Sequence, residues 1–311
     1  MFKSFEDSDL VWDSNSGKWV KPNEVKREES EKEFSVEVET VHFSDYLKNT
    51  ESLGNGRIFK SHFSSFDEQL EGIETGEVVV ISGHAKNGKT LFAESWLKSL
   101  MLKDPTCKTL FFSFEVKTRK LLMKYLEYES LPLYVPLVLK TMDFNWLYRC
   151  CKHAKEVNGV SIALIDHMHF MVDMNTKQNM SLNIGAFMRR LKQDIAIGLD
   201  MAVILIAHQG QAEKGKEASV YSIRDSSFVA QEADSVIVVS RRKNLDPVEF
   251  IDFRRNYGDE KADKVSIKDN AFIEDEYSQG LCVVSIERAR RSGVFEYKKL
   301  FKKTGHFMEE I

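Results

Sequence analysis

A glycine-rich segment at positions 83–90 has the clearest chemical potential in this sequence. It fits the pattern G-x-x-x-x-G-K-[ST] and consists of Gly83, His84, Ala85, Lys86, Asn87, Gly88, Lys89 and Thr90. In such a loop the glycines let the backbone wrap closely around phosphate groups, and amides at the start of the following helix donate to them. We expect Lys89 to meet the β and γ phosphates, Thr90 to ligate Mg²⁺ and Leu91 to complete the contact. The segment therefore predicts a site for ATP and Mg²⁺.

Two acidic residues follow apolar runs in the way that metal-binding and catalytic carboxylates do. Asp166 ends a run that starts at Ser161, and Glu115 ends one that starts at Thr109. At the carboxyl edge of a parallel sheet, Asp166 would lie beside Mg²⁺ and Glu115 could polarise the attacking water as a general base. Each residue alone has an ordinary alternative, because apolar runs that end in Asp are common and Glu115 could be a solvated glutamate.

A third apolar run ends in Ile206-Ala-His-Gln209. His208 and Gln209 would then lie where a polar side chain can touch the γ-phosphate and respond to its loss. For His208, a loop histidine with satisfied hydrogen bonds is the alternative. This run therefore adds His208 and Gln209 as two candidates for contacting the γ-phosphate.

The elements that would carry these residues alternate between strand and helix patterns. This alternation, from Phe66 onward, predicts an α/β fold with a mostly parallel, twisted central sheet flanked by helices. The strand candidates are Val78–Ser82, Thr109–Phe114, Ser161–Ile165, Ala202–Ala207, Ser235–Val239 and Leu281–Ile286. Two helical stripes are expected in the core, one of Phe92, Ala93, Trp96, Leu97, Leu100 and Met101 and one of Ile184, Phe187, Met188, Leu191 and Ile195.

The first 50 residues read as a separate arm. Trp12 and Trp19 lie in short apolar runs on either side of a polar turn, which predicts a small β-hairpin. An acidic run from Glu24 to Glu39 predicts a solvated linker, and residues 42–47 a short helix. Residues 243–279 are polar with little periodicity, which indicates an insertion or long loop before the last strands.

Composition limits the class of protein. The chain has 311 residues, of which 42% are apolar and 30% charged, enough for one large globular domain or two small ones. No apolar run approaches the roughly 20 residues that span a bilayer, and no secretory signal is visible, so we expect no membrane contact and a cytoplasmic location. A net charge of −4 argues against a coat of basic residues for non-specific nucleic-acid binding. No C-x-x-C spacing joins the four cysteines, which favours reduced structural thiols at Cys107, Cys150, Cys151 and Cys282.

These segments resemble the RecA-like motor domain of DnaB-type replicative helicases, from about Phe43 to the C-terminus. Phe112-Ser-Phe-Glu-Val116 is similar to the family's F-S-L-E-M, and Ile165-Asp-His-Met-His-Phe-Met171 to I-D-Y-L-Q-L-M. The most specific match is Ile223-Arg-Asp-Ser-Ser-Phe-Val-Ala-Gln-Glu-Ala-Asp234, against L-R-E-S-G-x-I-E-Q-D-A-D. The resemblance implies that residues 51–311 form a RecA-like ATPase domain and that Glu115 is its catalytic glutamate.

The segment Ile286-Glu-Arg-Ala-Arg-Arg-Ser-Gly293 resembles the family's I-x-K-x-R-x-G element, which reaches into the ATP site of a neighbouring subunit. By that match Arg288 replaces the lysine and contacts the nucleotide, and Arg290 is the arginine finger. Arg291 is the alternative finger, because the register near Gly293 allows a shift of one residue. A finger supplied in trans couples hydrolysis to subunit contact, so the resemblance implies a homo-oligomeric ring, a hexamer in this family.

The same resemblance suggests where single-stranded DNA would bind. In RecA-like rings, the loops after the metal-aspartate strand and after the sensor strand face the channel. On these loops Lys177, Asn179, Lys214 and Lys216 would hold phosphates without reading bases; polar surface loops without DNA contact are the alternative. Primase, helicase-loader and polymerase proteins are further partners that the resemblance implies.

The sequence also departs from the family. Its sensor reads Ala-His-Gln in place of Leu-Ser-Gln, so by the resemblance Gln209 matches the sensor by position and joins Lys89 and Glu115 as a candidate catalytic residue. We also expect no helical N-terminal collar, and a compact chain without one hints at a phage or plasmid protein working in a bacterial cell. The function implied is that of an ATP-dependent, ring-forming replicative DNA helicase that translocates on single-stranded DNA. Two alternatives stay open: a RecA- or KaiC-like DNA-dependent ATPase without unwinding activity, and a nucleotide-gated interaction protein.

Overall fold

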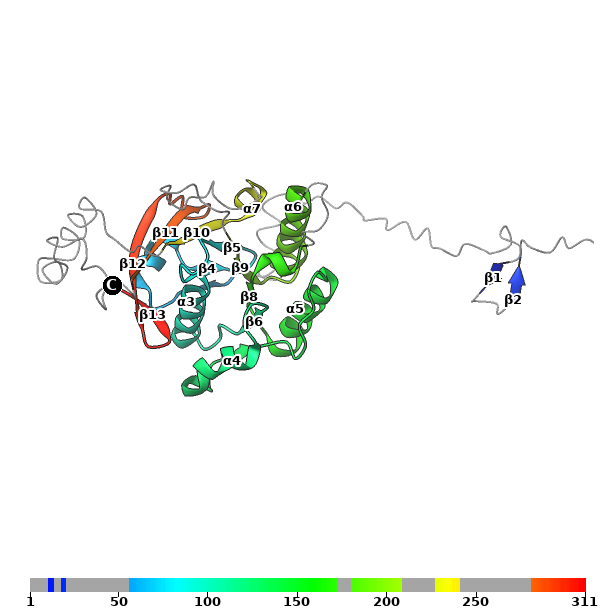
Figure 1. Cartoon of the computed structure of the whole chain (residues 1–311), viewed down its shortest axis with the longest axis horizontal. Helices are drawn as coiled ribbons and strands as arrows, with labels where there is room; N and C mark the ends of the chain where they lie inside the picture. Colours follow the sequence, from blue (N-terminus) through cyan, green and yellow to red (C-terminus); the bar gives the residue numbers. More distant parts are fainter. Residues whose placement is uncertain (1–10, 14–17, 21–55, 173–179, 209–226, 241–280) are drawn as a thin grey trace, which may run out of the picture. The chain divides into compact units, whose positions relative to one another are not determined.

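The computed structural model describes residues 11–13, 18–20, 56–172, 180–208, 227–240 and 281–311 (Figure 1). The chain divides into two compact units, Met1–Asn55 and Gly56–Ile311. In the first unit, strands β1 (Val11–Asp13) and β2 (Lys18–Val20) pair antiparallel with Trp12 opposite Trp19, in the segment where the sequence predicts a hairpin. The short helix predicted at residues 42–47 lies outside the described residues, as do the predicted linker and the 243–279 insertion.

The second unit is built on a nine-stranded sheet. Its strands are β5 (Val78–Ser82), β6 (Thr109–Ser113), β7 (Leu133–Tyr134), β8 (Ile162–Asp166), β9 (Ala202–Ile206), β10 (Ser235–Ser240), β11 (Leu281–Ala289), β12 (Tyr297–Thr304) and β13 (Phe307–Glu310). They are ordered β13-β12-β11-β10-β5-β9-β8-β6-β7. The run from β10 to β7 is parallel, and β11, β12 and β13 extend it antiparallel. Strands β3 (Ile58–Phe59) and β4 (Ile73–Glu74) form a separate small sheet.

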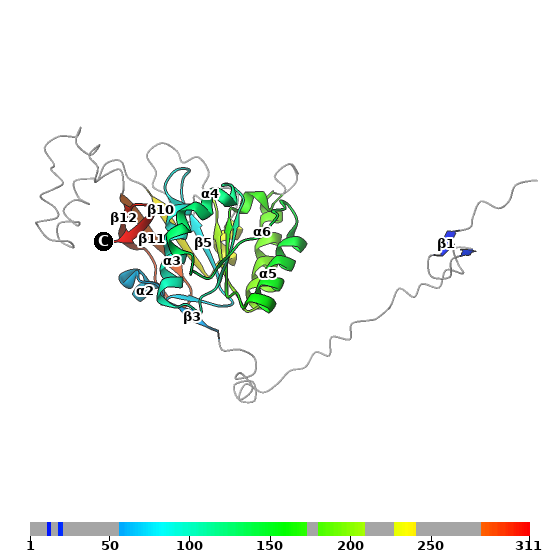
Figure 2. The ribbon, with the colours of Figure 1, turned by 90° about the horizontal axis from the view of Figure 1, so that it is seen from below.

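Helices cover both faces of the large sheet. In sequence order they are α2 (Ser64–Leu70), α3 (Lys89–Lys103), α4 (Thr118–Leu122), the 3₁₀ helix η1 (Met123–Tyr128), α5 (Phe144–Asn158), the 3₁₀ helix η2 (Met168–Phe170), α6 (Met180–Arg190), the π-helical η3 (Leu191–Ile197) and α7 (Ser227–Glu232). Figures 1 and 2 show α3 on one side of β5, and α5 and α6 on the other. This is the three-layer arrangement that parallel strands with crossover helices require.

Two hydrophobic cores lie on the two faces of the sheet. Because successive side chains of a strand point to opposite faces, Val79 and Ile81 of β5 belong to one core, and Val78 and Val80 to the other. The first core holds the predicted stripe of α3, and the second holds the predicted stripe that runs from α6 into η3. Both stripes are buried, which confirms them as core.

The predicted fold class is confirmed, and the strand ends differ by small amounts. The strands β6 and β9 end one residue earlier than predicted, whereas β8 begins and ends one residue later. The sequence did not predict the β12–β13 hairpin, because lysines interrupt its apolar pattern. Within the described ranges, no helix combines the length and hydrophobicity needed to cross a membrane.

Candidate nucleotide-binding site

The phosphate loop connects β5 to α3. β5 is buried along its whole length and ends at Ser82, so the loop that begins at Gly83 leaves the sheet at the carboxyl edge of the strands. Gly88 caps α3 with a φ of 92°, and Gly83 passes so close to the carbonyl of Val239 that an added Cβ would collide with it. Two glycines of the motif are therefore required by backbone geometry.

Lys89 folds back over this loop. Its Nζ donates to the carbonyl of His84 at 2.9 Å. Burial lowers the pKa of Lys89 to about 8, while the carboxylates of Glu115 and Asp166 act in the opposite direction. An ammonium group held above a glycine-rich loop at a helix start is suited to phosphate oxygens.

Thr90 and Asp166 meet beside the loop. Thr90 Oγ1 donates to Asp166 Oδ2 at 3.1 Å, and Asp166 is fully buried. The second carboxylate oxygen, Oδ1, is buried and has no hydrogen-bond partner within the described part of the chain. Burial raises the pKa of Asp166 to about 7. Since Mg²⁺ prefers carboxylate and hydroxyl oxygens, a buried oxygen without a partner beside a threonine hydroxyl fits the Mg²⁺ that accompanies ATP.

Three further polar residues converge because β6, β8 and β9 are neighbours in the sheet. The register aligns the carboxyl ends of these strands. His167 directly follows β8, and Glu115 and His208 each lie two positions after the last residue of β6 and β9. One ligand atom from each of the three lies within 4.8 Å of the other two. Glu115 is exposed, His167 is buried and His208 is half-buried.

The histidines of this edge form a compact group. The ring of His167 lies 4.3 Å from that of His208 and 5.2 Å from that of His169, measured between centroids. The backbone N–H of His169 also donates to Nδ1 of His167 at 3.4 Å. Burial, and then the neighbouring positive groups, lowers the pKa of His167 to about 3 and that of His208 to about 4. Both imidazoles are therefore neutral at pH 7.

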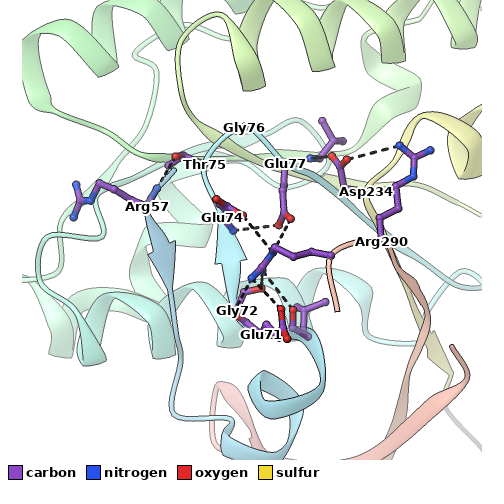
Figure 3. Close-up of polar contacts among 12 residues, drawn as sticks. Arg57, Glu71, Gly72, Glu74, Thr75, Gly76, Glu77, Asp234 and Arg290 are labelled. Carbon is purple, nitrogen blue, oxygen red and sulfur yellow. Dashed lines mark hydrogen bonds and ion pairs between the residues drawn. The ribbon is translucent and has the colours of Figure 1, made fainter. Parts of the chain in front are cut away.

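A second polar cluster lies at the opposite edge of the sheet, where β5 and β10 begin. Asp234, directly before β10, accepts from the Val78 amide at 2.7 Å and from Lys192 Nζ at 2.6 Å. Lys192 also donates to the carbonyl of Gly76 at 2.8 Å. Nη1 of Arg290 is 3.8 Å from Oδ1 of Asp234, and Figure 3 shows the Arg290 side chain directed toward that carboxylate. Asp234 thus connects the start of β5 to the turn after β11.

Arg291 is held inside its own chain. Its Nε donates to Glu77 at 2.9 Å and also lies 3.4 Å from Glu74. Its Nη2 donates to the carbonyl of Gly72 at 2.9 Å, and its Nη1 lies 3.6 Å from Glu71. Figure 3 shows the side chains of Glu71, Glu74 and Glu77 converging on the same region. Three carboxylates therefore anchor the turn that follows β11.

The other two arginines of this element differ in exposure. Arg288 donates to the carbonyl of Ala233 at 3.0 Å and is partly buried. Arg290 donates to the carbonyl of Gln231, and 49% of its side chain is exposed. Of the three candidate arginines, Arg290 has the most exposed side chain.

Several predicted residues lie outside the described ranges. These are the sensor Gln209 and the four candidate DNA contacts Lys177, Asn179, Lys214 and Lys216. Their roles stay predictions.

Sequence reasoning missed two features of the site. It did not single out His167, although the replacement of the family's tyrosine by histidine at this position was a visible signal. It also did not find the contact between Lys192 and Asp234, because 42 residues separate them in the chain.

Comparisons with known proteins agree with this architecture. A family model described as the DnaB-like helicase C terminal domain matches residues 59–132 and 131–270. The chain is 21% identical over 210 residues to the replicative DNA helicase DnaB of Leifsonia xyli subsp. xyli (strain CTCB07). This match covers 58% of this chain and 46% of that protein. It is 22% identical over 220 residues to the replicative DNA helicase DnaB of Treponema pallidum (strain Nichols), covering 60% of this chain and 49% of that protein. The matches thus span about half the length of these relatives.

Two solved structures have the same fold. One is an isolated ATPase domain, which superposes with a TM-score of 0.61 at 17% identity, covering 86% of this chain and 96% of that one. The other is a DnaB-like replicative helicase, determined in a study of its interactions with primase, which superposes with a TM-score of 0.59 at 17% identity, covering 86% of this chain and 65% of that one. At this level of identity, the likeness identifies the RecA-like fold.

Proposed function

We propose that this chain, which belongs to the family of DnaB-like helicase C-terminal domains, hydrolyses ATP to move along single-stranded DNA and separate duplex strands. One observation carries the proposal: the phosphate loop and the exposed Arg290 lie at opposite edges of one sheet. That placement suits an ATP site completed by a second copy of the chain.

The residues at the carboxyl edge would divide the chemistry. Lys89 and the amides of the loop would bind the phosphates, and Thr90 and Asp166 would hold Mg²⁺, which neutralises phosphate charge when it is bound. Glu115 would accept a proton from the attacking water, since it is exposed and lies beside this edge. Gln209 would contact the γ-phosphate.

Arg290 would act on a neighbouring copy because it is too far from its own phosphate loop. The loop follows Ser82 at the end of β5, whereas Arg290 contacts Asp234, which binds Val78 at the start of the same strand. A five-residue strand spans about 16 Å, which exceeds the reach of an arginine side chain. Repetition of such a head-to-tail contact generates a closed ring when the rotation between neighbours closes and an open filament when it does not; we propose the closed form, a hexamer.

The remaining partners follow from the same assignment. Single-stranded DNA would pass along Lys177, Asn179, Lys214 and Lys216, held by its phosphates, so binding should weaken as salt rises. A primase is a proposed partner, since one structural neighbour was determined in a study of its interactions with primase. A loader or polymerase would complete the replication assembly.

Strand separation of a forked DNA duplex with ATP and Mg²⁺ tests the proposal. We expect the intact chain to separate the strands, and Glu115→Gln and Arg290→Ala to bind ATP without doing so. The exposed residues Glu127 and Arg149 provide matched controls as Glu127→Gln and Arg149→Ala. If DNA leaves ATP hydrolysis by the intact chain unchanged and no strands separate, the helicase proposal is wrong.

Mixing the two inactive variants tests the finger in trans. A site between a Glu115→Gln chain that supplies Arg290 and an Arg290→Ala chain that supplies Glu115 has both groups intact. In a head-to-tail ring of random equimolar composition, about a quarter of the sites are intact, so the mixture should regain ATP hydrolysis. A mixture that stays as inactive as its components would contradict a finger supplied by the neighbour.

A further inference from the structure

We propose that Glu115, His167 and His208 form a binding site for a divalent transition-metal ion of the zinc class, distinct from the Mg²⁺ site at Thr90 and Asp166. The three residues belong to different strand ends that the sheet order brings together. Their ligand atoms already lie within 4.8 Å of one another. Within the described residues, this cluster is the one group of three or more His, Cys, Asp or Glu side chains whose ligand atoms all lie this close together.

The type of ligand decides the type of metal. Two imidazole nitrogens and one carboxylate suit zinc, nickel, copper or iron, whereas magnesium prefers oxygen ligands throughout. Two histidines and one acid with an open fourth position are also a known ligand set of zinc enzymes. The neighbouring Thr90 and Asp166 offer only oxygens, so the two sites would select different ions.

The ligands need only a small movement to close around an ion. Ligand atoms about 2.0–2.1 Å from zinc in tetrahedral geometry are about 3.3–3.4 Å apart, compared with the present limit of 4.8 Å. Glu115 is exposed and lies in the bend between β6 and α4, so its side chain has room to turn toward the histidines. If His167 binds through Nε2, its Nδ1 carries the proton and loses the long 3.4 Å hydrogen bond from the His169 amide. The loss is small, since a bond of that length is at the outer limit of effective geometry.

Metal binding here has a consequence for catalysis, which rests on the proposed function. An ion held by the Glu115 carboxylate occupies the oxygens that would accept a proton from water. Transition metal would therefore inhibit ATP hydrolysis while leaving the phosphate loop free to bind ATP. The family pattern has tyrosine and serine where this chain has His167 and His208, so the inhibition would belong to this chain's own residues.

Direct metal binding to the untagged full chain is the first test, in the absence of ATP and with Mg²⁺ in large excess. Zn²⁺ affinity is measured by competition with a chromophoric chelator, and coordination is followed by the visible absorption of bound Co²⁺. We expect one ion per chain, and a loss of affinity of about 100-fold or more in His208→Asn, since even outer-shell changes typically cost 10–100-fold. His167→Gln should do the same, and the exposed His153 provides the control as His153→Gln.

The His208 variant keeps the test decisive, because His208 is half-buried and its replacement disturbs packing less than that of His167. If His208→Asn and His167→Gln bind Zn²⁺ as tightly as the intact chain, the site is wrong, whatever the rate of ATP hydrolysis. Weaker binding in both variants but not in His153→Gln supports it.

Inhibition separates this proposal from the proposed function. For each variant we measure the free Zn²⁺ concentration that halves the rate of ATP hydrolysis, relative to the rate of the same variant without Zn²⁺, at constant Mg²⁺ and ATP. We expect half-inhibition of the intact chain near its Zn²⁺ dissociation constant, with the shift in His208→Asn matching its loss of affinity. Binding without inhibition would support the site and refute the assignment of Glu115 as the base.

Discussion

The carboxylate of Asp234 supports three parts of the fold at once, and its removal should destabilise the protein strongly. It accepts from the Val78 amide at 2.7 Å and from Lys192 at 2.6 Å, and it lies 3.8 Å from Arg290. Asp234 and Lys192 are largely shielded, with 14% and 19% of their side chains exposed. We expect Asp234→Ala to lower the free energy of unfolding by about 3 kcal/mol.

The magnitude follows from the separate contacts. A hydrogen bond from an amide to a charged acceptor contributes about 1.5–3 kcal/mol, and its loss leaves the Val78 amide without a partner. The shielded Lys192 ammonium loses its counter-charge but keeps the Gly76 carbonyl, so we assign about 1 kcal/mol to that pair. Arg290 is half exposed, so its contribution is close to zero. Asp234→Asn keeps an acceptor for Val78 and should therefore cost less than Asp234→Ala.

Equilibrium unfolding in urea, followed by far-ultraviolet circular dichroism, measures the effect. With a slope of about 3 kcal/mol per molar urea for a protein of this size, the midpoint of Asp234→Ala should fall by about 1 M. A double-mutant cycle with Lys192→Met isolates the ion pair. Glu156→Ala is the matched control, since its pair with Lys152 is exposed on both sides and should contribute less than about 0.5 kcal/mol.

Two results would refute the reasoning. One is a midpoint for Asp234→Ala that stays with that of the Glu156→Ala control at an unchanged slope. The other is a cycle in which the effects of Asp234→Ala and Lys192→Met add fully, because the shielded ion pair would then contribute nothing.

Two further predictions concern the core and the pH dependence of stability. Trp96 is fully buried against Phe92 and Phe66, so Trp96→Ala should cost about 3–5 kcal/mol in urea unfolding, whereas a cost below that of the exposed control Leu126→Ala would contradict the packing. Burial raises the pKa of Asp67, against the lowering effect of its hydrogen bonds from Ser61. The folded chain then keeps the Asp67 carboxyl group protonated to a higher pH than the unfolded chain does. The protonated carboxyl group therefore stabilises the fold below about pH 4, and this stabilisation is lost as pH rises through the folded pKa. The unfolding free energy of the intact chain minus that of Asp67→Asn should therefore fall with rising pH. A value that increases with pH would show that the folded pKa of Asp67 is lowered instead.

Local patterns were sufficient for the elements that depend on consecutive residues. The run Val78–Ser82, the glycines of the loop and the stripe of α3 lie next to one another in the chain, and each was predicted with its bounds nearly correct. The lysine-rich hairpin of β12 and β13 was not predicted, because its residues alternate weakly and it is stabilised by pairing with β11.

The sequence by itself determined the phosphate loop and the alternation of strands and helices, because both follow from short-range geometry: glycine conformations, helix starts and the two periodicities of buried side chains. Only the tertiary structure decided which strand ends are neighbours. The order β5-β9-β8-β6 differs from the order in the chain, and it brings Glu115, His167 and His208 together over a sequence separation that no local pattern spans. It also decided that Arg290 joins Asp234 at the edge opposite the phosphate loop, since hydrogen-bonded strand order is a property of the whole sheet.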